Sequence, residues 1–479
     1  MINNLSDDNL LIILEEFQDD KNKLFSWISV NKNWCKIIIS ILWKNPWKSL
    51  KKKSDKLLLN VIISHFSDET KSNLKNEHEL DFLTDSYRNP SFDYISFCRH
   101  LNFNKIERMI KSFHEKSKLS IIEKEIVNLF INGNRKYTHL YISYKFNYQL
   151  HLIPGFERCI SEIHYLNCST SIRDDLSAGL TELCKSIKVL DLFIESRDKN
   201  NYGIIDLIKA QEDLTKIGLT IHSYDDVLYC MNLEGSLIEH ANTVRCFKLT
   251  KRSTTKIISS FVHLRELEVN GCYNDISEWN CLGGISLPFL QILGVNKIPS
   301  NVLICLIEST NESLTEIRTD NIFYILTDEK RVIQAIYQKC PELQYLKLML
   351  TSNNISELER LLIKCHYLNG LFITNDIGFN WDKLFCVLAR SSPIHLFKFK
   401  FSNATTNYTV KEKPVPAAPN LESLKLFFDK WKDRHPMLLQ FGNIENVESL
   451  IEEYKAKGLD KKYNNIVSYG KGFDGFEWI

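Results

Sequence analysis

The feature that most constrains this chain is a short apolar pattern that recurs along most of its length. Each copy has an apolar residue, two residues of any type, a second apolar residue, one residue of any type, and a third apolar residue. The clearest copies begin at Leu264, Leu290, Leu343, Leu368 and Leu421. Weaker copies begin at Tyr137, Ile160, Ile187, Leu214, Val244, Leu314 and Ile394. Successive copies start 20 to 30 residues apart, which indicates one structural unit used many times.

The pattern and its spacing resemble leucine-rich repeats, whose period is about 20 to 29 residues. Within a copy the last apolar residues alternate with polar ones, which predicts a strand with one buried face. Between copies, apolar residues follow helical spacing, as at Ile355, Leu358, Leu362 and Cys365. We therefore predict an α/β fold in which residues 131–430 form a solenoid of about twelve repeats. Its curved parallel sheet would lie inside and its helices outside.

Three copies are preceded by a cysteine at the same offset, namely Cys184, Cys340 and Cys365. Their surroundings resemble the cysteine-containing repeats that are common in F-box proteins. One interpretation is metal or redox chemistry. We favour the other, in which a small side chain fills the tight corner between helix and strand, because single thiols one repeat apart do not make a tetrahedral metal site.

The first 50 residues predict a separate helical module. Ser6 or Asp7 can cap a first helix, and a polar turn over residues 18–23 leads to two further short helices. Large apolar side chains occur on more than one face of these helices. Because a unit of about 40 residues is too small to bury all of them, the surplus is expected to form an interface.

This module resembles the F-box. Residues that fall on the family's positions are Leu5, Asp8, Leu10, Ile13, Leu14, Phe17, Val30, Lys32, Trp34, Leu42 and Trp43. Two departures are Ser6 in place of the usual proline and Asn31 in place of a small residue. The segments 42–47 and 92–98 are also similar to F-box families of some fungi. The resemblance implies that an Skp-type adaptor is bound by Leu5, Leu10, Ile13, Leu14, Phe17, Val30, Trp34, Leu42 and Trp43. The alternative is that these helices only cap the solenoid.

Two further segments complete the predicted domain organisation. Residues 51–130 are predicted to be a helical linker between the module and the first repeat. It includes a run of lysines that is either a solvated face or a nuclear-import patch. Residues 431–479 are predicted to be a C-terminal cap with a helix over 447–457, since a solenoid needs its open end covered.

Composition and motifs narrow the class of protein. The net charge of +1 gives no sign of a nucleic-acid or membrane partner. No apolar run approaches the ~20 residues that a membrane span requires, and the N-terminus lacks the features of a signal peptide. Thirteen cysteines without a CxxC pair favour reduced thiols in a cytoplasmic or nuclear protein. There is no P-loop, HExxH, GxSxG or kinase motif, so we expect no catalytic residues, no metal and no cofactor.

The outward positions of the predicted strands provide candidate substrate-binding residues. These are the third, fifth and seventh residues of each copy, and the chosen ones are Glu266, Glu268, Arg318, Tyr345, Lys347, Phe372, Lys398, Lys425 and Phe427. Aromatic residues beside cations are typical of protein-binding hot spots. The alternative is that any solenoid displays such a mixture.

F-box proteins with C-terminal leucine-rich repeats are substrate receptors of cullin-based, SCF-type ubiquitin ligases. The resemblance therefore implies a non-enzymatic receptor: the module would bind an Skp-type adaptor and hence a cullin complex, and the repeats would hold an unknown protein substrate. The alternative is a leucine-rich-repeat interaction scaffold without a role in ubiquitin transfer.

Overall fold

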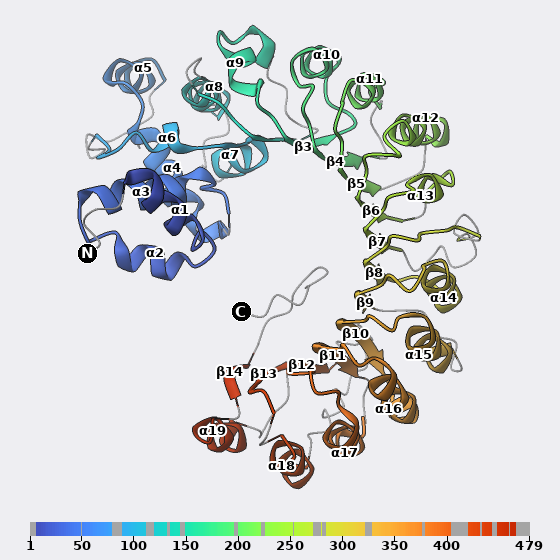
Figure 1. The fold of residues 1–479 in the computed structure, drawn as a ribbon. Coiled ribbons are helices and arrows are strands. Elements are labelled where there is room, and N and C mark those ends of the chain that lie inside the picture. The colour runs from blue at the N-terminus through green and yellow to red at the C-terminus, as the bar shows by residue number, and fades with distance from the viewer. Residues whose placement is uncertain are drawn as a thin grey trace, which may run out of the picture. The chain divides into compact units, whose positions relative to one another are not determined.

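The computed structural model of the chain consists of two compact units (Figure 1). Unit 1 holds residues 1–214 and 222–236, and unit 2 holds residues 215–221 and 237–479. The residues that the structure describes are 6–48, 50–78, 89–111, 119–131, 135–143, 149–195, 200–221, 226–251, 253–271, 279, 284–320, 328–375, 379–403, 420–431, 434–442, 448–458 and 460–465.

Unit 1 begins with helices and continues as alternating strands and helices. The helices before its first strand are α1 (Asp7–Glu15), α2 (Lys21–Trp27), α3 (Lys32–Lys44), α4 (Asp55–Ser64), α5 (Asp68–His78) and α6 (Tyr94–Phe97). The strands are β1 (His100–Asn102), β2 (His139–Ile142), β3 (Tyr165–Ser169) and β4 (Val189–Ile194). The helices that follow β1 are α7 (Phe103–Ile110), α8 (Leu119–Phe130), α9 (Phe156–Ile160), α10 (Asp174–Leu183), α11 (Gly203–Lys209) and most of α12 (Val227–Ile238). Within this unit, β1 pairs in parallel with β2, β2 with β3, and β3 with β4.

Unit 2 repeats the same alternation. Its strands are β5 (Lys216–Ile221), β6 (Cys246–Thr250), β7 (Glu266–Asn270), β8 (Ile292–Asn296), β9 (Glu316–Asp320), β10 (Tyr345–Leu350), β11 (Gly370–Asn375), β12 (Lys398–Asn403), β13 (Met437–Gly442) and β14 (Asp460–Asn465). Its helices are α13 (Ile257–Ser260), α14 (Ser300–Glu308), α15 (Asp328–Lys339), α16 (Ile355–Lys364), α17 (Trp381–Ser391), α18 (Leu421–Asp429) and α19 (Glu448–Ala456). All of these strands pair in parallel and in chain order. Within this unit, helices α14 to α19 lie along one side of the strands (Figure 1).

The apolar pattern forms the core of unit 2 in register. Leu267 pairs with Leu293, Leu293 with Ile317, Ile317 with Leu346, and Leu346 with Leu371. All five side chains are fully buried. The predicted α/β class, with N-terminal helices followed by parallel strands that alternate with helices, is therefore confirmed, and the architecture is that of a leucine-rich-repeat solenoid. Along each strand, the residues that alternate with the buried apolar row lie on the opposite face of the sheet. We call that opposite face the strand face.

The cysteines that precede three copies lie at the corner between helix and strand. Cys184 donates a weak hydrogen bond to the carbonyl of Ile160 at 3.5 Å, and Cys365 donates one to the carbonyl of Cys340 at 3.7 Å. Each of these contacts reaches back one repeat. Burial raises the pKa of the Cys184 and Cys365 thiols to about 12, so both thiols remain protonated. This geometry supports the packing interpretation.

The array begins earlier than the sequence analysis placed it. Strand β1 lies inside residues 51–130, which were predicted to be a helical linker. In the register of the sheet Leu101 pairs with Leu140, so the copy that forms β1 starts at Cys98. A cysteine fills the first apolar position here and is fully buried. The copy was missed because its first position holds a small cysteine where the other copies have a large apolar residue.

The copy predicted at Leu421 is wrong, because residues 421–429 form helix α18. Leu424, Phe427, Phe428 and Trp431 are buried, and their separations of three, four and seven residues are those of one helical face. Asn420 caps this helix by accepting a hydrogen bond from the backbone N–H of Glu422 at 3.0 Å. The strand of this repeat is β13 instead, in which Leu439 pairs with Phe399 of β12.

Three other boundaries change as well. The copies assigned to Ile160 and Ile394 start at Ile163 and Leu396, because Leu166 pairs with Leu140 and Phe399 with Leu371. The predicted helix over 447–457 is observed as α19, but strands β13 and β14 show that the repeats continue through the predicted cap. The division between units 1 and 2 falls within residues 131–430, the predicted solenoid.

Candidate interaction surfaces

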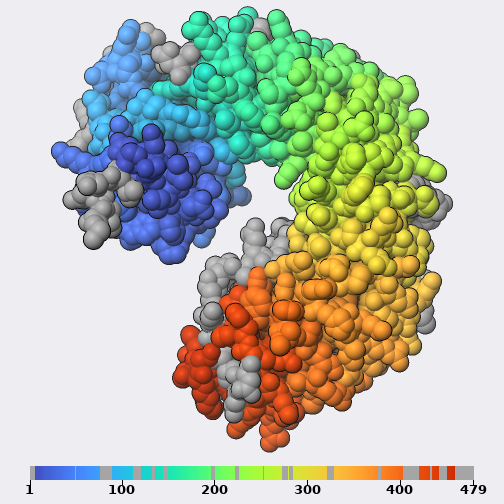
Figure 2. All heavy atoms as spheres, viewed as in Figure 1, coloured from blue at the N-terminus to red at the C-terminus, as the bar shows by residue number. Residues whose placement is uncertain are grey.

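The N-terminal module, helices α1 to α3, is fixed by one capping side chain at each helix start. Ser6 accepts from the N–H of Asn9 at 3.3 Å, Asp20 from Lys23 at 3.2 Å, and Asn31 from Trp34 at 2.9 Å. The departure Asn31 thus has a structural role as a cap of α3. The core of the module consists of Leu10, Leu14, Leu24, Ile37, Ile38 and Ile41. The module forms one end of unit 1 and is drawn in dark blue in Figure 2.

The predicted adaptor-binding residues divide between the core and the surface. Leu10 and Leu14 are 4% and 1% exposed, so assigning them to an interface was wrong: they hold α1 against α3. Phe17, Trp34 and Leu42 pack against the same core and are partly exposed. Trp43 stacks on Tyr94 with ring centroids 4.8 Å apart. Leu5 lies outside the described residues.

The remaining two predicted residues are on the surface together with two that the sequence analysis missed. Ile13 and Val30 are 46% and 55% exposed, and Ile12 and Phe25 are 61% and 58% exposed. Next to Val30 lies a cavity of about 630 Å³. Its lining residues are Ile28, Ser29, Asn31, Lys32, Cys35, Lys36 and Phe92. A small module that leaves several large apolar side chains in water has the character of a docking surface.

On the strand face of unit 2, strands β6 to β9 carry a network of ion pairs. Lys248 contacts Glu268 at 2.9 Å and Glu268 contacts Arg318 at 3.3 Å, although Glu268 and Arg318 are two strands apart. The intervening position in the register is Gly294, which has no side chain to separate them. Arg318 also binds Glu316 at 2.6 Å, and Glu266 lies 3.7 Å from Lys248. Glu266, Glu268 and Arg318 were all predicted on this face, and the network joins them.

Strands β9 to β12 bring cations against aromatic rings. Lys347 binds Asp320 at 2.7 Å, and its ammonium lies 4.7 Å from the ring centre of Phe372. Lys400 approaches the same ring at 4.6 Å from the next strand. Such contacts are worth roughly 0.5 to 2 kcal/mol, depending on their exposure to water. Lys347 and Phe372 are buried within this face, so they pack beneath its surface and offer little side-chain area for contact with a partner.

Tyr345 and Lys398 meet across a second glycine. The ammonium of Lys398 lies 5.1 Å from the ring centre of Tyr345 and 3.3 Å from its hydroxyl. Gly370 stands between them in the register, and a Cβ there would lie 2.7 Å from Cδ1 of Tyr345. A glycine is therefore required at this position for the ring to lie across β11.

Two residues assigned to this face are not on it. Lys425 and Phe427 belong to helix α18, where Phe427 is fully buried. Phe427 packs against Phe399 and Trp431 with ring centroids 5.5 and 5.2 Å away. Both assignments were wrong because a helical stripe was interpreted as a strand.

The strand face of unit 1 carries a histidine and tyrosine cluster that the sequence analysis missed. His100 stacks on His139 at 3.7 Å, and His139 on Tyr165 at 5.2 Å. The Tyr165 hydroxyl donates to Asp191 at 2.5 Å. Burial and the neighbouring ring lower the pKa of His100 to about 3, and burial lowers that of His139 to about 4, so both imidazoles are neutral at pH 7. These residues occupy outward positions of copies that start at Cys98, Tyr137 and Ile163. The first copy was missed and the third was placed out of register, whereas the second was in register and its outward residues were not chosen.

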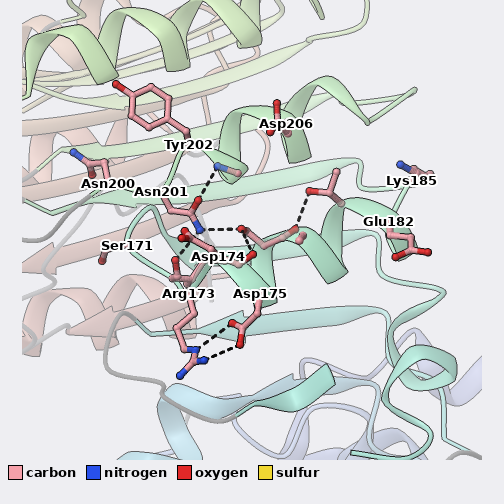
Figure 3. Close-up of a pocket in the computed structure, with 15 residues that line it drawn as sticks. Ser171, Arg173, Asp174, Asp175, Glu182, Lys185, Asn200, Asn201, Tyr202 and Asp206 are labelled. Carbon is pink, nitrogen blue, oxygen red and sulfur yellow. Dashed lines mark hydrogen bonds and ion pairs between the residues drawn. The ribbon is translucent and has the colours of Figure 1, made fainter. Parts of the chain in front are cut away.

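A cavity of about 1100 Å³ lies between α10 and α11 in unit 1 (Figure 3). Its polar groups are engaged with one another: Arg173 pairs with Asp175 at 2.7 Å, and Asn201 donates to Ser177 and to the carbonyl of Ile172 at 2.8 Å each. The N–H of Gly203 donates to the Asn201 side chain at 2.7 Å. The two bonds donated by Asn201 connect successive repeats, and the cavity is the space left between their helices.

Within the described part of the chain, no three His, Cys, Asp or Glu side chains gather as metal ligands would. In the same residues, no helix has both the length and the apolar character of a membrane span.

Comparisons with known proteins do not identify a family for this chain. No family model matches the chain, and no curated protein matches it. Among solved structures, the leucine-rich repeat-containing protein LegL7 from Legionella pneumophila is similar, with 13% identity and a TM-score of 0.32. The match covers 57% of this chain and 81% of that protein. Its TM-score is too low to support any inference.

Proposed function

We propose that this chain is the substrate-recognition subunit of a cullin-based, SCF-type ubiquitin ligase. In this proposal the N-terminal module binds an Skp-type adaptor and the repeats hold a protein substrate, while the partner enzyme performs the chemistry. The observation that carries the proposal is the set of exposed apolar side chains Ile12, Ile13, Phe25 and Val30 on a module whose sequence resembles the F-box. The absence of catalytic motifs from the sequence supports a non-enzymatic role.

The repeat architecture supports the other half of the proposal. Parallel repeats expose an extended strand face, which suits the binding of a protein along several strands. The described strand face of unit 2 includes Arg318 and Tyr345, and arginine and tyrosine are enriched among the residues that dominate binding energy at protein interfaces.

A scaffold whose N-terminal helices only cap the repeats is the second candidate, and one contact favours it. The indole N–H of Trp47, just after α3, donates to the carbonyl of His100 in β1 at 2.6 Å. The N-terminal segment is therefore tied to the first strand of unit 1, as a cap would be.

Co-expression with an Skp-type adaptor tests the proposal. We expect the two proteins to copurify, and we expect Ile13→Asp with Val30→Asp to weaken the complex tenfold or more, because a charge would enter an apolar contact. Leu57→Asp is the matched control, since Leu57 is 68% exposed on α4 in the same unit but outside the module. A monodisperse wild-type chain that binds no adaptor would favour the capped scaffold.

A further inference from the structure

Charge is segregated along the strands of unit 2. Strands β6 to β9 contain the carboxylates of Glu266, Glu268, Glu316 and Asp320 and the cations of Lys248 and Arg318. The sequences of β10 to β13 contain no Asp or Glu, and their charged residues are Lys347, Lys398 and Lys400. The strand face therefore changes from net negative to net positive between β9 and β10.

Lys347 is ion-paired with Asp320 of β9, but Lys398 has partners of another kind than the cations of β6 to β9. Lys248 and Arg318 are ion-paired with glutamates on the neighbouring strands. Lys398 contacts the ring and hydroxyl of Tyr345 and the ring of Phe397, and no carboxylate of the described residues is within ion-pair distance of it. A lysine held by aromatic rings keeps its full positive charge, because a ring neutralises none of it.

The adjacent strand presents a hydrogen-bond acceptor. Gln440 on β13 pairs in register with Lys400 and is 4% exposed. Its side-chain oxygen Oε1 has no hydrogen-bond partner in the described part of the chain. A backbone N–H of a bound peptide would satisfy this oxygen, which a buried acceptor requires.

We propose that the strand face over β10 to β13 binds an acidic segment of a partner protein, whose carboxylates or phosphates contact Lys398 and Lys400. This inference rests on the proposed function, in which the repeats hold a protein, and it specifies the chemical class of that protein's recognition segment. The opposite charge of β6 to β9 keeps the acidic stretch of the segment over β10 to β13, because carboxylates or phosphates would be repelled by the net negative charge of β6 to β9.

The same face fits a nucleic acid poorly. Phe372 lies between Lys347 and Lys400 in the register, so its ring is occupied by two ammonium groups and is not open for a base to stack on. A phosphate backbone that continued along the sheet would next meet the carboxylates of β7 and β9. A protein segment with an acidic stretch is free to change charge along its length.

A peptide selection on the full chain tests the proposal. A random twelve-residue library is selected on the wild type, on Lys398→Glu with Lys400→Glu, and on Lys364→Glu with Lys383→Glu. The last variant carries the same charge change on exposed lysines of α16 and α17. We expect Asp and Glu to be enriched among peptides bound by the wild type and by the control, and the strand-face variant to lose that enrichment.

Binding measurements on the selected peptide then identify the anion. Fluorescence anisotropy should show about tenfold weaker binding to the strand-face variant than to the control, in line with two solvent-facing ion pairs. A version with phosphoserine in place of glutamate distinguishes phosphate from carboxylate recognition. Absent enrichment of acidic residues, or enrichment unaffected by the strand-face variant, would overturn the proposal. So would a twelve-residue oligothymidylate that binds the wild type more tightly than the acidic peptide does. Adaptor copurification is measured separately, so a failure here leaves the proposed function standing or falling on its own test.

Discussion

The assignment of residues 421–429 to a helix predicts an unequal effect of two neighbouring substitutions. In helix α18, Phe427 is fully buried and Leu426 is 45% exposed. In a strand that continued the apolar pattern, Leu426 would point inward and Phe427 outward. Phe427→Ala and Leu426→Ala therefore distinguish the two conformations by the order of their effects.

The magnitude follows from what each side chain contacts. The ring of Phe427 has Phe385, Phe399 and Trp431 as neighbours, with centroids 5.6, 5.5 and 5.2 Å away. Truncating a buried phenylalanine to alanine costs about 3 to 5 kcal/mol of unfolding free energy, since it removes apolar contacts and leaves a cavity. Leu426→Ala should change that free energy by no more than about 0.5 kcal/mol, as is usual for surface positions.

Hydrogen exchange is the suitable assay because the chain has two units and a single unfolding midpoint would mix them. Amides in β12 and β13 should exchange about 10²-fold faster or more in Phe427→Ala, and at the wild-type rate in Leu426→Ala. Peptides from β2 to β4 in unit 1 provide the internal control. The reverse order, with Leu426→Ala the more damaging substitution, would refute the helix and restore the strand.

Three further predictions follow from burial, from repeat coupling and from titration. Leu346→Ala should lower the unfolding free energy of unit 2 by about 2 to 5 kcal/mol, while Met349→Ala, which is partly exposed, should cost less; urea unfolding of the two variants compares them, and equal losses would contradict the register. Ending the chain after Asn420 removes α18, β13, α19 and β14 and uncovers the edge of β12, so the shortened protein should aggregate or melt at a lower temperature; an equally stable, monodisperse product would show that these repeats are dispensable. The pKa values of His100 and His139 in the folded chain are about 3 and about 4, below the unfolded value of roughly 6.5. Between these limits the unfolded state binds more protons than the folded state. The stability that these residues contribute above pH 6.5 is therefore lost as the pH falls towards 4. Replacing them by His100→Asn and His139→Phe should flatten the dependence of the melting temperature on pH from 7 to 4.5, and an unchanged slope would assign it to other groups.

The sequence was sufficient for the fold wherever the pattern was leucine-rich and in phase. Leu267, Leu293, Leu346 and Leu371 are the second apolar residues of the copies predicted at 264, 290, 343 and 368, and they are fully buried and in register. Each such strand has the same requirement, an apolar row that packs beneath the sheet, so spacing alone reveals it. The helical spacing of apolar residues between strands was equally informative, and the structure has helices in these segments, as at α16 and α17.

The pattern failed where other residues meet the same packing requirement. Cys98 occupies a leucine position in the first copy, and Ile160 lies three residues before the true start, Ile163. A shift by an odd number of residues exchanges the two faces of a strand. For this reason Tyr165 was not recognised as an outward residue, and His100 was missed together with the copy that starts at Cys98. At Leu421, apolar residues at 421, 424 and 426 fit the strand template, and only the continuation to Phe427, Phe428 and Trp431 identifies the helix.

The candidate sites were harder to predict than the fold, because exposure depends on packing between elements. Leu10 and Ile13 were both predicted to bind the adaptor, yet Leu10 is in the core of the module and Ile13 is on its surface. On the strand face, the positions of Glu268 and Arg318 were predicted, but their contact across a whole strand depends on Gly294 between them. A list of outward residues does not show such a gap.

The central claim is that the N-terminal module is a docking site for an adaptor while the strand face remains available. Hydrogen exchange of the full chain with and without a purified Skp-type adaptor tests this claim most directly. We predict slower exchange in residues 7–44, which hold α1 to α3, and unchanged exchange in β6 to β13. Protection confined to the strands, or no change anywhere at adaptor concentrations well above micromolar, would contradict it.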